Sequence, residues 1–145
     1  MAQERSTRQR KAIMDALVGA ERPMTPEELL VLAQASVPKL GIATVYRAIK
    51  AMRDGGEVVA VEVPGHATCY ETAHRAHHHH FHCRGCERVF EVDGCVHGVN
   101  AIAPAGFRVE DHEIVLKGLC ALCAKGSAPR TPPGPFAPDP LATPR

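Results

Sequence analysis

Two pairs of cysteines have the spacing of a metal site. Cys83 and Cys86 form one Cys-x-x-Cys knuckle, Cys120 and Cys123 form a second, and residues 87–119 separate the two. Each knuckle can offer two thiolates, and four thiolates complete the tetrahedral shell of a structural zinc ion. A redox role for one Cys-x-x-Cys pair is the alternative, which the second pair disfavours. We predict a structural zinc site whose binding free energy is part of the free energy of folding.

A run of histidines leads directly into the first knuckle. The segment HRAHHHHFHCRGC occupies residues 74–86, in the middle of the chain, so the run is not a terminal affinity tag. Because side chains alternate between the two faces of a strand, a strand over 77–82 would divide the histidines. One face would carry His78, His80 and His82, and the other His77 and His79. The run would then serve two metal sites; the alternative is a solvated cluster without a ligand role.

Other residues could complete these two sites. They carry the imidazole, thiolate and carboxylate groups that bind transition metals. The candidates are His66, Cys69, Glu71, Glu91, Cys95, His97 and His112.

The composition is that of a soluble globular protein. Apolar residues make up 45% of the 145 residues and charged residues 23%, and no apolar run is long enough to cross a membrane. The first residues, MAQERSTRQR, lack the apolar core of a signal peptide. We therefore expect a cytoplasmic protein with no membrane partner, in which six cysteines are metal ligands or reactive thiols rather than disulfides.

The N-terminal part of the chain is basic and predicts helices. Residues 1–54 carry nine Lys/Arg against six Asp/Glu, whereas the remainder carries eight against ten. This modest bias suits a nucleic-acid-binding module. Apolar residues at helical spacing predict a first helix across Ile13–Ala20. A second helix begins at Thr25, where Glu28 completes a capping-box signature.

A third helix is predicted between Gly41 and Gly55. At about 100° per residue it has one apolar face and one polar face. The apolar stripe comprises Val45, Ala48, Ile49 and Met52. The opposite face comprises Ala43, Tyr46, Arg47 and Lys50, with Thr44 at its edge. Strand-like segments at 57–63 and 67–72 follow, which together with the helices indicates a winged helix-turn-helix that binds DNA. A small helical bundle with a solvated basic face is the alternative.

Beyond the wing the pattern changes to short strands. Strand-like runs occupy residues 77–83, 88–92 and 112–120, around a segment of low regularity at 93–106. From residue 126 to 145 the chain holds seven of its twelve prolines, which predicts a disordered tail.

Four segments of the chain together match one known family. They are TRQR (7–10), GIATVYRAIKAMRDGGEV (41–58), YETAHRAHHHHFHCRGCERVFEV (70–92) and HEIVLKGLCALC (112–123). In combination they resemble the ferric uptake regulator (Fur) family of metal-dependent repressors, and most of all its zinc-uptake-regulator branch. The resemblance implies an α+β fold. It places an N-terminal winged helix-turn-helix domain at 1–64, a hinge at 65–76 and a small C-terminal α/β dimerisation domain with a four-cysteine zinc site at 77–125, ahead of the proline-rich tail at 126–145.

The resemblance also implies roles for individual residues. Arg10 matches the family arginine that reaches the DNA backbone or minor groove, and Tyr46 and Arg47 match the recognition-helix pair. Thr44 and Lys50 lie beside them in the predicted third helix and join the DNA-binding set. The regulatory metal site between the domains maps onto Glu71, His78, His80 and Glu91. An additional site inside the dimerisation domain maps onto His77, His79 and His112.

The chain departs from the family pattern at two points. Iron and peroxide sensors of the family usually carry a histidine before the second helix, where this chain has Pro23; Cys69, or else His66, would replace that ligand. The acidic ligand of the additional site is also absent, and Cys95 lies close enough to substitute. Zinc favours four-coordinate sulfur and nitrogen sites, whereas iron and manganese favour more oxygen ligands. Both departures favour zinc as the regulatory metal, with iron or manganese as the alternative.

These observations predict a homodimeric, zinc-responsive transcriptional repressor rather than an enzyme. It would bind palindromic, AT-rich operators of metal-uptake genes. An iron-, manganese- or peroxide-sensing repressor of the same family is the runner-up. A zinc hydrolase with Glu71 or Glu91 as its base is a distant alternative, because the chain has no evident substrate-binding segment. A thiol oxidoreductase that uses Cys83 and Cys86 is another.

Overall fold

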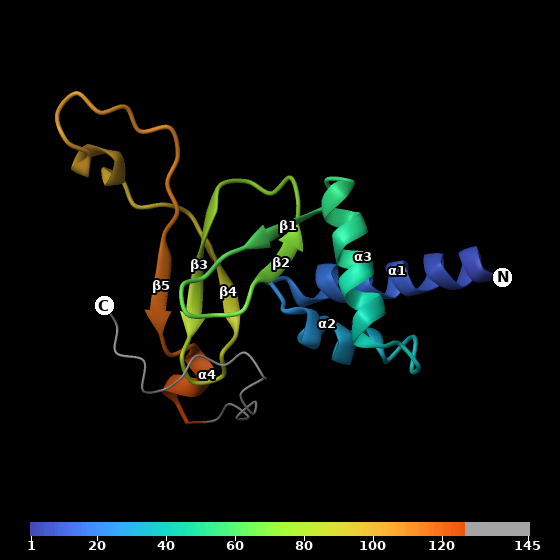
Figure 1. Cartoon of the computed structure of the whole chain (residues 1–145). Helices are drawn as coiled ribbons and strands as arrows, with labels where there is room; N and C mark the ends of the chain where they lie inside the picture. The colour runs from blue at the N-terminus through green and yellow to red at the C-terminus, as the bar shows by residue number, and fades with distance from the viewer. Residues whose placement is uncertain (127–145) are drawn as a thin grey trace.

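The computed structural model describes residues 1–126, so the predicted tail at 126–145 lies, apart from Gly126, outside the described residues. Three helices, a two-stranded wing and a three-stranded sheet follow one another along the chain (Figure 1). The fold is therefore α+β, as predicted. None of the helices within residues 1–126 is both long enough and apolar enough to span a membrane.

The second and third N-terminal helices begin close to their sequence signals, whereas the first begins well before the predicted segment Ile13–Ala20, because the basic residues ahead of Ile13 are also helical. The three helices are α1 (Ala2–Ala20), α2 (Pro26–Ala33) and α3 (Ile42–Asp54). The predicted capping box of α2 is confirmed, since Thr25 Oγ1 accepts from the Glu28 N–H at 3.2 Å and the Glu28 carboxylate accepts from the Thr25 N–H at 2.9 Å.

The apolar stripe of α3 forms one side of the core. Val45, Ile49 and Met52 are almost fully buried and pack with Ile13 of α1 and Leu29 of α2. This confirms the helical period predicted for the third helix. The polar face of α3 is consequently left on the outside of the helical bundle.

The wing consists of β1 (Val58–Val61) and β2 (Cys69–Thr72), paired antiparallel. Tyr70 of β2 also exchanges two backbone hydrogen bonds with Met24, at 3.0 and 2.8 Å, which fastens the wing to the chain before α2. Figure 1 shows the wing between the helices and the second sheet. Strand β2 lies within 65–76, the segment predicted as a hinge. The loop before β2 reverses the chain, so this segment returns to pair with β1 instead of leading directly to the second sheet.

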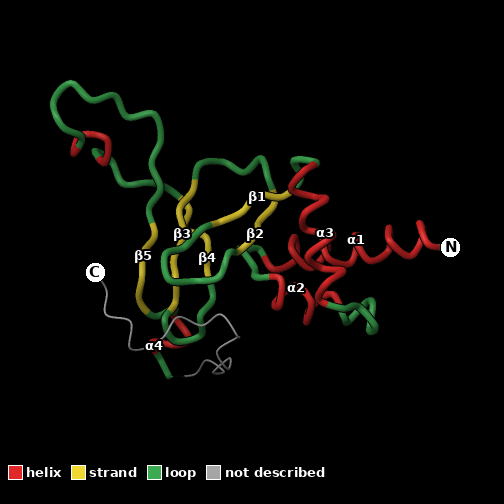
Figure 2. The backbone as a smooth tube through the Cα atoms, in the orientation of Figure 1, coloured by secondary structure: helices red, strands yellow, loops and turns green. Residues whose placement is uncertain are grey.

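The second sheet has β3 (His78–Cys83) at its centre. On one side β4 (Val89–Asp93) pairs antiparallel with it, and on the other β5 (Val115–Gly118) pairs parallel. The strand expected at 77–82 is confirmed as β3, which begins and ends one residue later than predicted. The long loop between β4 and β5 projects away from the sheet (Figure 2). It contains a single 3-10 turn, η1 (Val99–Ile102), and the four-residue helix α4 (Ala121–Ala124) follows β5.

Candidate functional site

The four cysteines of the two knuckles meet at one point. Their sulfur atoms all lie within 4.8 Å of one another, and those of Cys86 and Cys120 are 4.0 Å apart. The parallel pairing of β3 with β5 explains this, because it sets Cys83 beside Gly118 and so carries Cys120 to the first knuckle. The arrangement can hold one tetrahedral ion.

The backbone around these cysteines favours a thiolate cluster. The Cys120 N–H donates to Cys83 Sγ at 3.2 Å. Burial opposes ionisation of this thiol, but the N–H groups of Cys120, Cys86 and Gly85 outweigh it and lower the pKa of Cys83 to about 6. A Cβ atom at Gly85 would lie 2.7 Å from Cys123 Sγ, so the close approach of this turn requires glycine.

A second group, which we call the interdomain group, consists of Glu71, His78 and His80. Glu71 lies on the wing strand β2, and both histidines lie on β3. His78 Nε2 is 3.0 Å from Glu71 Oε1, and His80 Nε2 is 3.2 Å from Glu71 Oε2. The two histidines reach the same carboxylate because residues two apart on a strand share a face. The group therefore connects the wing to the three-stranded sheet.

The surroundings favour the charged forms of Glu71 and His78 within the interdomain group. Burial favours the neutral acid of Glu71, yet hydrogen bonds from His80 and His78 outweigh it and lower the pKa of this carboxyl. Burial likewise opposes the charged ring of His78, but the Ala76 carbonyl and the Glu71 carboxylate outweigh it and raise the pKa of this imidazole. A metal ion that binds here would compete with a proton for His78.

Glu91 lies beside the interdomain group, on β4 and opposite His80. Its Oε2 accepts from Arg75 at 2.7 Å, and its Oε1 lies 3.5 Å from His78 Nε2. Within residues 1–126 this buried Oε1 accepts no hydrogen bond. An unpaired buried oxygen is costly, and a cation held by the interdomain group would give it a partner.

The structure does not bring Cys69 or His66 into the interdomain group. Cys69 shares a face with Glu71 but is displaced two residues along β2, roughly 7 Å. Its Sγ lies instead 3.6 Å from His66 Nδ1, and burial, helped by the nearby Glu28 carboxylate, raises the pKa of this thiol to about 12. Pro23 provides only a carbonyl, which accepts from Arg22 at 3.1 Å.

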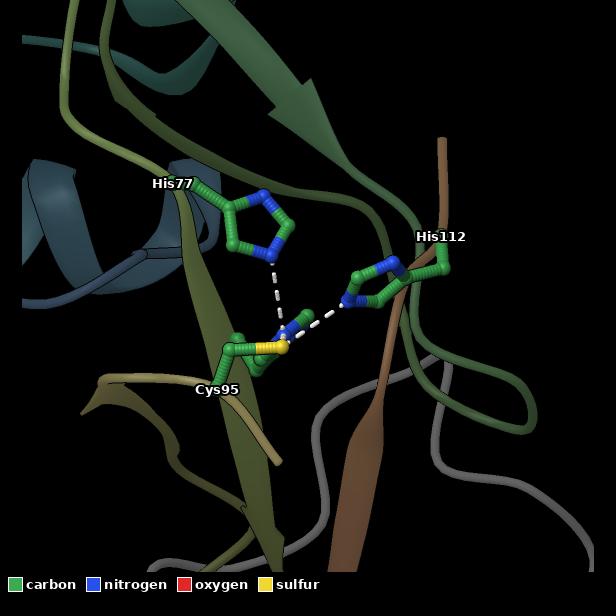
Figure 3. Close-up of side chains that lie close together, drawn as sticks. His77, Cys95 and His112 are labelled. Atoms are coloured by element: carbon green, nitrogen blue, oxygen red, sulfur yellow. Dashed lines mark hydrogen bonds between the residues drawn. The ribbon is translucent and has the colours of Figure 1, made fainter. Parts of the chain in front are cut away.

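The other face of β3 contributes to a third group, which comprises His77, His79, Cys95 and His112. Figure 3 shows His77, Cys95 and His112 pointing toward one another. His79 Nε2 is 3.1 Å from His77 Nε2 and 3.2 Å from Cys95 Sγ, and Cys95 Sγ is 3.0 Å from His112 Nε2. Burial and the neighbouring imidazoles lower the pKa of His79, which favours the neutral, metal-binding ring. The Ile114 N–H donates to its Nδ1 at 3.1 Å, which places the proton of the neutral ring on Nε2, so a metal ion on Nε2 would require this hydrogen bond to be given up.

The division of the histidines between the two faces of β3 therefore follows strand parity. His82 joins neither of the two groups formed by the other four histidines. His82 lies beside His66 and Glu87, a group that the sequence did not indicate. His97 belongs to none of the four groups formed within residues 1–126. The missed group has no sequence signature, since its members come from the wing loop, a strand and a turn.

The polar face of α3 carries four of the predicted DNA-binding residues. Tyr46, Arg47 and Lys50 are exposed and Thr44 is half-buried. Arg47 donates to Thr44 Oγ1 at 3.2 Å, and Tyr46 Oη donates to the Glu27 carboxylate at 3.2 Å. The fifth residue, Arg10 of α1, forms an ion pair with Glu57.

The chain also resembles known proteins. The family model of the ferric uptake regulator family matches residues 1–117. The ferric uptake regulation protein of Campylobacter jejuni is 29% identical over 122 residues, which cover 81% of this chain and 78% of that protein. The peroxide operon regulator of Bacillus subtilis is 27% identical, over 83% of this chain and 85% of that protein. A solved zinc-bound manganese uptake regulator superposes with a TM-score of 0.67 at 28% identity, over 77% of this chain and 87% of that one.

The chain combines a winged helix with a second sheet, and it has groups of potential metal ligands both between these two parts and inside the second one. Together with the family match, this combination defines a metal-responsive transcriptional regulator. The chain belongs to the ferric uptake regulator family.

Proposed function

We propose that this family member is a homodimeric repressor with zinc as its regulatory metal, acting in the cytoplasm on palindromic, AT-rich operators of metal-uptake genes. One observation carries the regulatory part. Glu71 of the wing converges with His78 and His80 of the second sheet, and the unpaired Oε1 of Glu91 lies next to them. A cation bound there would hold the wing against the sheet.

Metal binding would act by shifting a population of domain arrangements. Without metal, the wing is connected to the second sheet through these imidazole–carboxylate contacts and through a small apolar cluster in which Val61 and Cys69 of the wing pack with Val89 of β4. With metal, Glu71 and the two histidines share one ion, so arrangements with the wing swung away lose those bonds. The gain in DNA-binding free energy is limited by the difference in the ion's affinity for two arrangements, one with the wing against the sheet and one with the wing swung away.

The choice of zinc rests on the two imidazoles of the interdomain group and on the donor atoms of the group on the other face of β3, because Cys69 brings no thiol to the interdomain group. The group on the other face of β3 offers three imidazoles and the thiol of Cys95, a donor set typical of zinc. We propose that it is an additional zinc site and that the four knuckle cysteines hold structural zinc. The interdomain group has a carboxylate of its own and Glu91 beside it. That oxygen content favours a second candidate, an iron or manganese sensor.

Exposed apolar side chains support the homodimer. They lie in the loop, strand β5 and helix α4 of the second domain, where they contact water in the single chain. They are Val96, Ile102, Phe107, Leu116, Leu119 and Leu122. Covering them with the same surface of a second copy would remove this apolar area from water.

Neither enzyme alternative gains support from the arrangement of the site. Cys83 and Cys86 lie in a four-thiol cluster rather than as an isolated dithiol. A cleft of about 810 Å³ does open beside Glu71 and Glu91, between α1 and β4. It lies along the junction of the two domains, which agrees with a hinge as well as with a substrate pocket.

The proposal is tested by measuring operator affinity across buffered metal ions. Duplexes would first be enriched from a random pool with zinc-loaded protein. Binding of the enriched duplex would then be titrated against free zinc, iron(II) and manganese(II) concentrations. Zinc should restore binding at the lowest free concentration. Restoration by iron or manganese at physiological concentrations, with zinc inactive, would instead establish the second candidate.

A further inference from the structure

His66, His82 and Glu87 form a compact group at the other end of the wing from Glu71. His66 lies in the loop between β1 and β2, His82 on β3, and Glu87 in the turn after the first cysteine knuckle. One ligand atom of each lies within 4.8 Å of the others. His82 Nε2 is 2.8 Å from Glu87 Oε2, and the two imidazole rings meet edge to face with centroids 4.8 Å apart. We call this set the knuckle group.

We propose that the knuckle group is a further metal site of the zinc class, in which His66, His82 and Glu87 are the protein ligands and water takes the fourth position. Two imidazoles and one carboxylate are a recurrent zinc shell with one open position. Ligand atoms around tetrahedral zinc lie about 3.4 Å apart, as the bond lengths require. His82 Nε2 and Glu87 Oε2, now 2.8 Å apart, would have to separate slightly, whereas any ligand atoms near the 4.8 Å limit of the group would have to approach one another.

The surroundings of His66 favour a cation at this place. Its Nδ1 lies 2.7 Å from the carbonyl oxygen of Ala67, and its Nε2 lies 2.6 Å from the carbonyl oxygen of Glu87. A neutral imidazole has a single N–H and can donate to only one of these acceptors. A metal ion on Nε2 would let Nδ1–H donate to Ala67, but the Glu87 carbonyl oxygen now lies too near Nε2 to leave room for an ion and would have to move back from it.

The backbone of Glu87 supplies an independent argument. Its φ is +59°, in the left-handed region that costs a side-chain-bearing residue free energy. Glycine would adopt this conformation without strain. A strained residue persists where its side chain is needed, and here the side chain of Glu87 reaches His82. The strain therefore agrees with a ligand role for the carboxylate.

The location predicts what metal at the knuckle group would do. His82 precedes Cys83 and Glu87 follows Cys86, so two ligands are joined directly to the four-cysteine cluster, whereas His66 belongs to the wing loop. An ion would fasten the wing to the cysteine cluster, as a second metal-mediated connection besides the one proposed at the interdomain group. This effect on operator binding rests on the proposed function, whereas metal binding itself does not.

The test compares zinc stoichiometry in full-length variants. His66→Gln removes the wing ligand and leaves the cysteine knuckle untouched. Glu87→Gly removes the carboxylate and relieves the left-handed backbone, so loss of metal cannot be attributed to misfolding if its Tm stays equal or rises. His97→Gln is the matched control, since His97 joins none of the groups within residues 1–126. All proteins would be equilibrated with the same buffered free zinc and analysed by mass spectrometry of metals.

Both ligand variants should hold one zinc ion fewer per chain than the wild type and His97→Gln. In nitrogen-15 spectra, the ring signals of His66 and His82 should shift on zinc addition in the wild type and not in Glu87→Gly. Equal stoichiometry in all four proteins, with these ring signals unmoved, would overturn the site. If zinc fails to promote operator binding even in the wild type, the proposed function falls while the stoichiometry still reports on the knuckle group. If the site binds zinc but both variants keep wild-type operator affinity, the inference that this ion fastens the wing for operator binding is wrong.

Discussion

At the scale of single residues, Gly85 and Cys123 illustrate how closely the cysteine cluster constrains its neighbours. A Cβ atom on residue 85 would lie 2.7 Å from Cys123 Sγ and 2.9 Å from Cys123 Cβ. Atoms at such separations overlap, so one of them has to move. Cys123 lies in α4, which begins directly after Cys120. A displacement of Cys123 would therefore open the cluster.

Gly85→Ala should therefore make the structural zinc accessible to a chelator and lower the Tm, since zinc binding is part of folding. The matched control is Gly19→Ala on α1, where a Cβ atom meets nothing within 4 Å. That substitution should raise stability by up to about 1 kcal/mol through helix propensity. Thermal unfolding and zinc release to a chromophoric chelator measure both. A Gly85→Ala protein with wild-type Tm and protected zinc would contradict the proposed cluster.

At the scale of elements, strand β3 separates two groups of candidate metal ligands. His78 and His80 face the wing, where the Glu71 carboxylate is their partner, and His79 faces the loop that carries Cys95. The separation follows from the alternation of side chains along the strand. Substitutions one residue apart should consequently have different effects.

His80→Ala should abolish metal-dependent operator binding while the dimer and the cysteine zinc remain, because it removes a ligand shared between the domains. His79→Ala should instead shift the metal response or weaken the dimer, with partial operator binding preserved. Metal titrations read by operator binding, together with sedimentation of the dimer, distinguish the two. Identical behaviour of both variants would mean that the two faces of β3 do not serve separate sites.

The pairing of β3 with β5 makes the second domain depend on its cysteines. Only four residues of β5 pair with β3, and the long loop before it contributes one 3-10 turn. Cys120→Ser should therefore unfold the second domain or leave the protein monomeric, as the metal's binding free energy is lost from folding. Circular dichroism and sedimentation velocity would detect this. A folded, dimeric and DNA-competent Cys120→Ser protein would eliminate the structural role of the site.

At the scale of the whole molecule, DNA binding has to release contacts that the free protein makes with itself. Arg10 is paired with Glu57 and Tyr46 with Glu27. A phosphate can replace a carboxylate at Arg10 at little cost, because both partners are anions. Tyr46, 44% exposed on α3, can offer its ring to thymine methyl groups in the major groove.

Arg10→Ala should weaken binding to all sequences about equally and reduce the dependence of affinity on salt by about one ion. Tyr46→Ala should change the preference among operator variants by about 1–3 kcal/mol at the contacted base pair. Both are measured by binding isotherms at several salt concentrations with matched and mismatched duplexes. Should Tyr46→Ala weaken every duplex alike, its base-reading role would be wrong.

The sequence by itself determined the features that depend on neighbouring residues. The capping box at Thr25 and Glu28 involves groups three residues apart, so its hydrogen bonds form wherever a helix begins there. The buried stripe of α3 follows from a period that the chain repeats over several turns. The parity of His78, His79 and His80 is likewise local, because it needs only a strand.

The tertiary structure decided which distant residues meet. The sequence offered Cys69 and His66 as ligands beside Glu71, but two residues along a strand span roughly 7 Å, and both lie elsewhere. The antiparallel return of β2 and the tight knuckle turn instead bring His66 and Glu87 to His82. Such meetings depend on strand register and on chain reversal. No local spacing encodes these, because the residues come from separate elements that only packing brings together.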